Sequence, residues 1–160
     1  MLYELKMRLT SPWLGQQRTN QHVRRFRREK DGRLMIDTAQ WQWALQEAAE
    51  ALHIEDIDIA TIRTESGFDA PTLQLFNRRY SHKGKPHEEM FESIRENTIL
   101  TFNILVTKPL PIVGESNGQR QPDLDELNKL FSFVGKMIGL SPWGTRFGFG
   151  KFTVEQITAT

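Results

Sequence analysis

The chain has 160 residues, 38% of them hydrophobic and 26% charged, which suits one domain with its own core and is short for two. It has no cysteine and no apolar run long enough to span a membrane, so disulfides and thiolate chemistry are excluded and we expect a cytoplasmic protein that does not bind membranes. With 21 basic and 20 acidic residues the net charge is +1, so only the distribution of charge can indicate a partner.

The first half of the chain predicts a strand, a long polar loop, a helix and a second strand. Residues 2–9 alternate apolar and polar side chains, which indicates a strand with one solvated face rather than a secretory signal. The loop covers 16–33 and ends in a turn before a short hairpin strand. Asp37 or Thr38 can cap a helix that runs to about His53, and residues 56–63 return to a period of two.

Residues 64–97 form the least regular part of the sequence. Residues 73–80 indicate one strand of a protruding hairpin with a basic turn at 82–86. Pro86 then predicts the start of a short helix that continues through Glu92.

The C-terminal part predicts a strand, a helix and a last strand. Residues 98–106 carry apolar side chains on both faces, which indicates a central strand. Pro122 and Asp123 open a helix with an apolar stripe, and Gly139 ends it. Phe152 and Val154 belong to the final strand.

Basic residues are concentrated in two places. From Arg18 to Arg33 there are seven Arg and Lys residues and two acidic residues. From Arg78 to Lys85 there are four Arg and Lys residues and no acidic residue. The acidic residues gather elsewhere. This segregation predicts a basic face on a nearly neutral protein, although such charge runs often form only a solvated loop.

A glycine-rich stretch covers 139–152. Its four glycines allow positive φ and a close approach of the backbone to a ligand. Aromatic side chains, which offer flat faces for stacking, alternate there with cations that suit phosphates: Trp143, Arg146, Phe147, Phe149 and Lys151. Helix capping and core packing are the alternative explanation.

The order strand, helix, strand, strand, helix, strand predicts an α+β fold. We expect the ferredoxin-like or RRM-like βαββαβ arrangement, a four-stranded antiparallel sheet with long insertions after the first and second strands. The first and last strands are neighbours in that fold, so residues 10–15 and 140–145 would lie side by side. Both contain Ser-Pro-Trp, which would bring Trp13 and Trp143 to one end of the sheet.

The stretch Gly144-Thr-Arg-Phe-Gly-Phe-Gly-Lys-Phe152 and the helix before it resemble the RAMP superfamily of CRISPR-associated RNA-binding proteins. A weaker likeness is Asp31-Gly-Arg-Leu-Met-Ile36. The resemblance implies one ferredoxin-like domain over 1–160, with 16–33 as a basic RNA-contacting loop and 64–97 as a thumb-like insertion. The chain departs from the family at Thr38–Trp43, where members usually carry small residues and a lysine.

These observations favour non-catalytic binding of single-stranded RNA or DNA, as part of a larger ribonucleoprotein or a filament, with no cofactor or metal. The residues expected to contact the nucleic acid are Trp13, Arg24, Arg25, Arg27, Arg28, Trp143, Arg146, Phe147, Gly148, Gly150 and Lys151. Two alternatives stay open: a small endoribonuclease with His22, beside the arginines, as its general acid or base, and a module that contacts other protein subunits. Salt-dependent binding of nucleic acid separates the last alternative from the other two.

Overall fold

The computed structural model describes residues 1–19, 22–69, 72–109, 119–140 and 148–160. Within these ranges the protein is an α+β structure with two α-helices and mostly antiparallel sheets. Its largest sheet has the order β11-β1-β10-β6, and all three neighbouring pairs are antiparallel. The strands are β1 (Leu2–Leu9), β6 (Ile62–Thr64), β10 (Ile99–Val106) and β11 (Phe152–Ala159).

One face of this sheet is the core face. The predicted alternation of β1 is confirmed, because Tyr3, Leu5, Met7 and Leu9 are buried while Glu4 and Lys6 are exposed. On β10 the even-numbered positions from Leu100 to Val106 are buried in the same way. The predicted central position of β10 is also confirmed, since it lies between β1 and β6.

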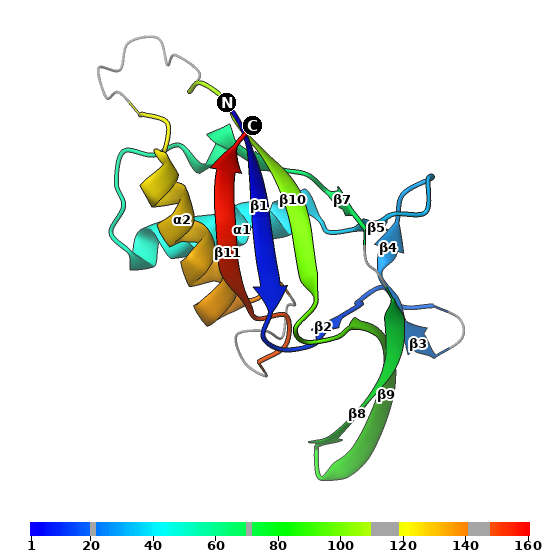
Figure 1. The fold of residues 1–160 in the computed structure, drawn as a ribbon. Helices are drawn as coiled ribbons and strands as arrows, with labels where there is room; N and C mark the ends of the chain where they lie inside the picture. The colour runs from blue at the N-terminus through cyan, green and yellow to red at the C-terminus, as the bar shows by residue number, and fades with distance from the viewer. Residues whose placement is uncertain (20–21, 70–71, 110–118, 141–147) are drawn as a thin grey trace.

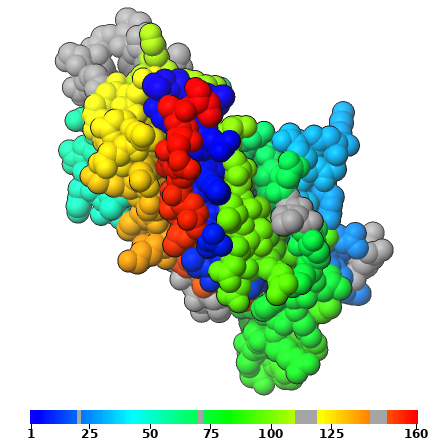
Figure 2. Space-filling view, in the orientation of Figure 1, coloured from blue at the N-terminus to red at the C-terminus, as the bar shows by residue number. Residues whose placement is uncertain are grey.

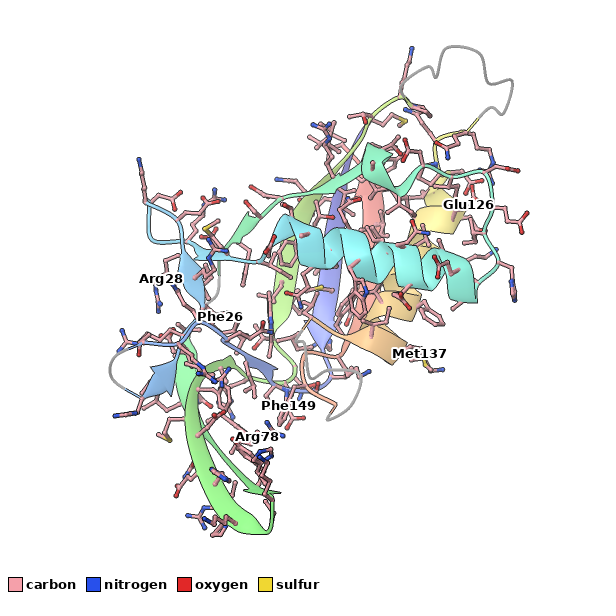
Figure 3. The ribbon with its side chains drawn as sticks, turned by 180° about the vertical axis from the view of Figure 1, so that it is seen from behind. Phe26, Arg28, Arg78, Glu126, Met137 and Phe149 are labelled. Atoms are coloured by element: carbon pink, nitrogen blue, oxygen red, sulfur yellow. The ribbon has the colours of Figure 1, made fainter. Side chains whose placement is uncertain are left out.

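Both helices cover the core face (Figures 1 and 3). Helix α1 (Thr38–Ala51) begins at Asp37, whose side chain accepts the Ala39 N–H, as predicted. The sequence predicts an apolar stripe from Trp41 to Leu52 on this helix; it is buried at Trp41, Ala44, Leu45, Ala48 and Ala49, whereas Ala51 is exposed. The indole of Trp41 meets Phe102, Phe131 and Phe152 edge to face, with ring centroids 5.7, 5.6 and 6.4 Å away. Helix packing on the sheet therefore centres on Trp41.

Helix α2 (Leu124–Phe133) continues into a π-helix, η2 (Val134–Ile138), and Gly139 ends it with a φ of 80°. A capping box opens it: the Asp123 carboxylate accepts the Glu126 N–H at 2.8 Å, and the Glu126 carboxylate accepts the Asp123 N–H at 3.2 Å. The guanidinium of Arg120 donates to both Glu126 oxygens, at 2.5 and 2.7 Å. This hydrogen bonding, led by Arg120, lowers the pKa of Glu126 to about 2 from 4.5.

The Glu126 carboxylate should make stability depend on pH at the acidic end. Because its pKa is lowered by folding, its contribution is complete above about pH 4.5 and is lost as the pH falls towards about 2. Glu126→Gln keeps a side-chain oxygen that can accept the Asp123 N–H but removes the charge. We therefore expect it to reduce the free energy of unfolding by about 1 kcal/mol at neutral pH. Urea titrations of parent and variant at neutral pH and near pH 2 check this. A difference in free energy of unfolding between the two proteins that is equal at both pH values would contradict it.

The segment 16–33 is more ordered than the predicted loop. Val23–Arg24 forms β3, Arg27–Arg28 forms β4, and Gln17 makes a bridge to Arg25. Strand β3 pairs with β9 (Lys85–Ile94), and β4 pairs with β5 (Leu34–Met35). Strand β2 (Trp13–Leu14) also pairs with β9, and β7 (Gly67–Phe68) completes the sheet of β4 and β5.

The hairpin predicted after residue 73 is confirmed as β8 (Leu73–His82) and β9, and it protrudes from the body of the protein (Figures 1 and 2). Its turn is Lys83-Gly84, with φ values of 51° and 72°. The helix predicted from Pro86 to Glu92 is wrong, because every residue of that stretch pairs with β8. Pro86 lies near the tip, where β8 is the only neighbouring strand that the structure describes, a position at which strands tolerate proline.

The second predicted strand is shorter than its alternating pattern. The strand is Ile62–Thr64, β6, instead of 56–63, and within the predicted range Ile57 makes only an isolated bridge to Arg120. Asp58 accepts the Ala60 N–H and opens the 3-10 helix η1 (Ile59–Thr61), which delays the strand.

No helix among the described residues covers the other face of the main sheet. Figure 2 shows β11, β1 and β10 side by side on this surface. Its exposed side chains include three large apolar residues, Leu2, Ile99 and Leu105. Of the helices that the structure describes, none has the length and apolar character needed to cross a membrane.

Candidate nucleic-acid interface

The loop that leaves β1 lies beside residues 150 and 151, at the entry to β11; of the stretch 140–145 that was predicted to lie there, 141–145 are outside the described residues. Thr10 N–H donates to the Lys151 carbonyl at 2.9 Å, and Gly150 N–H donates to the Pro12 carbonyl at 2.7 Å. The Ser11 hydroxyl oxygen accepts the Lys151 N–H at 2.9 Å. Residues 148–151, called the glycine-rich segment from here on, are thus fixed at one end of the main sheet.

The same segment contacts the hairpin. The ring of Phe149 packs edge to face on Phe76 of β8, with centroids 5.5 Å apart. Figure 3 shows Phe149 near Arg78 of β8, beside the hairpin. Although Phe76 and Phe149 are far apart in the sequence, this contact brings the glycine-rich segment and the protruding hairpin together.

The outer half of the hairpin presents stacked rings and cations. The guanidinium carbon of Arg78 lies 4.7 Å from the ring centroid of Tyr80, and Tyr80 stacks on His87 at 5.5 Å. Arg79, Lys83 and Lys85 are exposed near the tip. The nearest acid, Glu88, approaches Arg79 only to 3.8 Å, and both side chains are largely exposed, so the pair offers weak competition to a phosphate.

The arginines of residues 16–33, the basic segment, differ in role. Arg24 pairs with Glu89 of β9 at 3.3 Å. Arg28 makes two hydrogen bonds to Glu92, at 3.1 and 2.7 Å, and this bonding raises the pKa of Arg28. Both arginines therefore hold the segment against the hairpin. Arg27 is the more available cation, because it is exposed and, unlike the exposed Arg28, makes no ion pair within the described residues.

A cavity of about 370 Å³ separates the basic segment from the hairpin. His22 lines it from one side, with a φ of 60°, and His87 and Tyr80 line it from the other. Arg18 and Arg24 add positive charge, and Glu88 and Glu89 add negative charge, to the same walls. The structure thus brings His22, the predicted catalytic candidate, to one cavity with a second imidazole.

Trp13 is a core residue. It is 2% exposed, stacks on Phe68 at 4.8 Å and meets Phe26 edge to face at 5.3 Å. Because its indole is packed on Phe26 and Phe68, Trp13 belongs to the core and does not form the exposed stacking surface that was predicted for it.

The other predicted residues of the glycine-rich stretch divide into two groups. Trp143, Arg146 and Phe147 lie outside the described residues. Gly148 is exposed with a φ of 77°, and Gly150 is buried with a φ of 70°. Lys151 is half-buried, and this burial lowers its pKa.

Sequence reasoning missed Tyr80 and His87 as members of the site. The available signal was the alternation of Arg78, Tyr80 and His82, which places the three side chains on one face of a strand. The error at Pro86 hid the partner strand, so His87 was not placed opposite Tyr80.

A scan of protein-family models finds no match to this chain, and a search of curated proteins finds no similar sequence. Within the described ranges, no group of three or more His, Asp or Glu side chains is arranged to hold a metal ion. Any functional proposal therefore depends on the side chains described above.

Proposed function

We propose that this protein binds single-stranded nucleic acid, RNA in preference to DNA, without cleaving it. The observation that carries the proposal is the contact of Phe149 with Phe76, because it joins the glycine-rich segment to a hairpin of cations and stacked rings. Strand β3 lies against the same hairpin, so the three elements expected to contact RNA adjoin one another.

The chemistry of this surface suits an unpaired strand. Exposed Arg27, Arg79, Lys83 and Lys85 provide cations for the phosphates. Tyr80 and His87 provide ring faces on which bases can stack, and such stacking tolerates any sequence. Single-stranded bases, unlike those of a duplex, can leave their neighbours to make these contacts.

The proposed fold is ferredoxin-like, with the RAMP superfamily as the proposed relationship. The sheet order β11-β1-β10-β6 and the two helices on one face support it. We also propose a cytoplasmic ribonucleoprotein of several subunits as the setting. The exposed Leu2 and Leu105, which are register partners on the open sheet face, suit a contact with another subunit.

Titration with labelled oligonucleotides tests this proposal. We expect the parent protein to bind single-stranded RNA more tightly than single-stranded DNA or duplex RNA. Affinity should fall linearly on a log–log plot against salt, with a slope of about −0.7 per phosphate contacted. Absence of binding, or binding that does not depend on salt, would reject it in favour of a protein-interaction module.

An endoribonuclease is the second candidate, favoured by the cavity that His22 and His87 share. Two imidazoles facing one phosphodiester can act as general acid and general base. Incubation of the parent protein with labelled RNA distinguishes the candidates. Specific cleavage that is lost in His22→Ala and His87→Ala would establish the nuclease, whereas intact RNA with all three proteins supports pure binding.

Gly148 offers a test of close backbone approach. A Cβ at this position would meet nothing within 4 Å, so a side chain would project into open space. We expect Gly148→Val to reduce RNA affinity more than the loss of any single arginine, because a side chain in the path of the strand disturbs several contacts together. Filter binding measures this.

Backbone strain must be separated from that effect, since φ at Gly148 is positive. Gly32→Val is the matched control: Gly32 also has a positive φ and open surroundings, but lies in the turn between β4 and β5 and is not among the residues expected to contact RNA. Thermal melts of both variants report folding. A folded Gly148→Val protein that binds like the parent would contradict close approach at this glycine.

A further inference from the structure

A second cavity, of about 420 Å³, lies between the basic segment and the beginning of α1, away from the hairpin rings. Four of its lining residues are buried: Trp13, Leu14, Phe26 and Ile36. Its size and its apolar floor are typical of sites that take a small, flat molecule.

The wall formed by α1 carries an unusual side chain. Trp43 lines this cavity and is 55% exposed, whereas Trp41 of the same helix is 1% exposed in the core. Within the described structure Trp43 makes no contact with another aromatic ring, so its half-exposed indole offers a face for stacking.

Apart from Met35, the rest of the lining is polar. Gln16 and Gln17 contribute amides, Asp37 a carboxylate, and the exposed Arg27 a cation. Amides both donate and accept hydrogen bonds, which matches the edge of a nucleobase better than an aliphatic side chain of a protein partner.

Gln40 connects this cavity to the glycine-rich segment. Its side-chain amide donates to the Leu140 carbonyl, and Leu140 N–H donates to the Gly150 carbonyl at 2.9 Å. A strand bound along residues 148–151 therefore passes close to the cavity.

We propose that the cavity takes one nucleobase, unstacked from its neighbours in the bound strand, with Trp43 stacking on the base. The inference depends on the proposed function and adds a base-specific subsite to it. Arg27, at the same opening, is placed to meet the phosphate of that nucleotide.

A double-mutant cycle between protein and ligand tests the proposal. The two proteins are the parent and Trp43→Ala, and the two ligands are a single-stranded RNA and an abasic sugar-phosphate strand of equal length. Trp43→Ala should weaken RNA binding roughly 5- to 150-fold, the effect of losing one stacked base, with the salt slope unchanged. Binding of the abasic strand should not change, because that strand has no base to insert.

Three variants make the result specific. Trp43→Phe should restore most of the affinity, since it keeps a ring. Gln17→Trp, at an exposed position of the cavity lining, should obstruct the opening and weaken RNA binding with Trp43 still present. Met137→Ala removes another half-exposed apolar side chain outside the cavity and should change nothing.

The failures are distinguishable. Suppose that the parent binds RNA. If Trp43→Ala then weakens binding of the RNA and of the abasic strand equally, or weakens binding of neither, the base subsite is rejected while the proposed function stands. If the parent binds no single-stranded RNA, the proposed function fails, and the subsite with it.

Discussion

Gly135→Ala is expected to lower the free energy of unfolding by about 3 kcal/mol and the melting temperature by about 6–12 °C. Gly135 is buried in η2, where the helix presses on the first residue of β11. A Cβ there would lie 2.2 Å from the Phe152 carbonyl oxygen and 2.6 Å from a carbon of its ring. The first of these atoms is backbone held in the sheet, so the helix itself must move.

The sign of this effect is informative, because alanine normally stabilises a helix relative to glycine by roughly 0.5–1 kcal/mol. Lys136→Ala, at the next and exposed position, is the control and should change stability by less than about 0.5 kcal/mol. Chemical denaturation of the three proteins gives the comparison. A Gly135→Ala protein as stable as the parent would show that η2 does not pack on Phe152 this closely.

The second large effect concerns the hairpin tip. Replacing Arg79, Lys83 and Lys85 together by alanine should weaken binding to single-stranded RNA and reduce the log–log salt slope by about 2, from about 0.7 for each lost phosphate contact. Folding should be unaffected because all three side chains are exposed. Fluorescence anisotropy over a range of salt concentrations measures both quantities.

A control variant that loses three cations elsewhere on the protein tests whether the position of the hairpin-tip cations matters. Lys6, Lys108 and Lys129 are also exposed, but lie on the open sheet face, after β10 and on α2. Their replacement by alanine removes the same charge and should leave the slope close to that of the parent. Equal losses in the two triple variants would mean that general charge attraction, and not the hairpin, binds the strand.

The long elements were predictable because each buries one face along most of its length. The alternation of β1 specifies a period of two and was confirmed; the stripe of α2 specifies a period of about 3.6 and was confirmed from Leu127 onward, whereas Leu124, predicted as its first member, is exposed. The stretch 86–92 was not predictable locally. Its glutamates favour a helix by propensity, but pairing with β8 over ten residues outweighs that preference.

The candidate site was only partly predictable, for a related reason. Arg24 and Arg28 appear free in sequence because Glu89 and Glu92 follow 65 and 64 residues later. Trp13 follows a proline in a loop, which suggested exposure, yet Phe26 and Phe68 enclose it. Contacts between distant residues decide both cases, and no local pattern encodes them.

Cross-linking of the parent protein to a thiouridine-containing single-stranded RNA, followed by mass spectrometry, tests the location of the interface most directly. We expect the cross-linked residues to fall in β8 and β9, in the basic segment at 22–28 and at 148–152. Cross-links confined to the other end of the sheet, around Arg120 and Glu126, would contradict a nucleic-acid interface built from the hairpin and the glycine-rich segment.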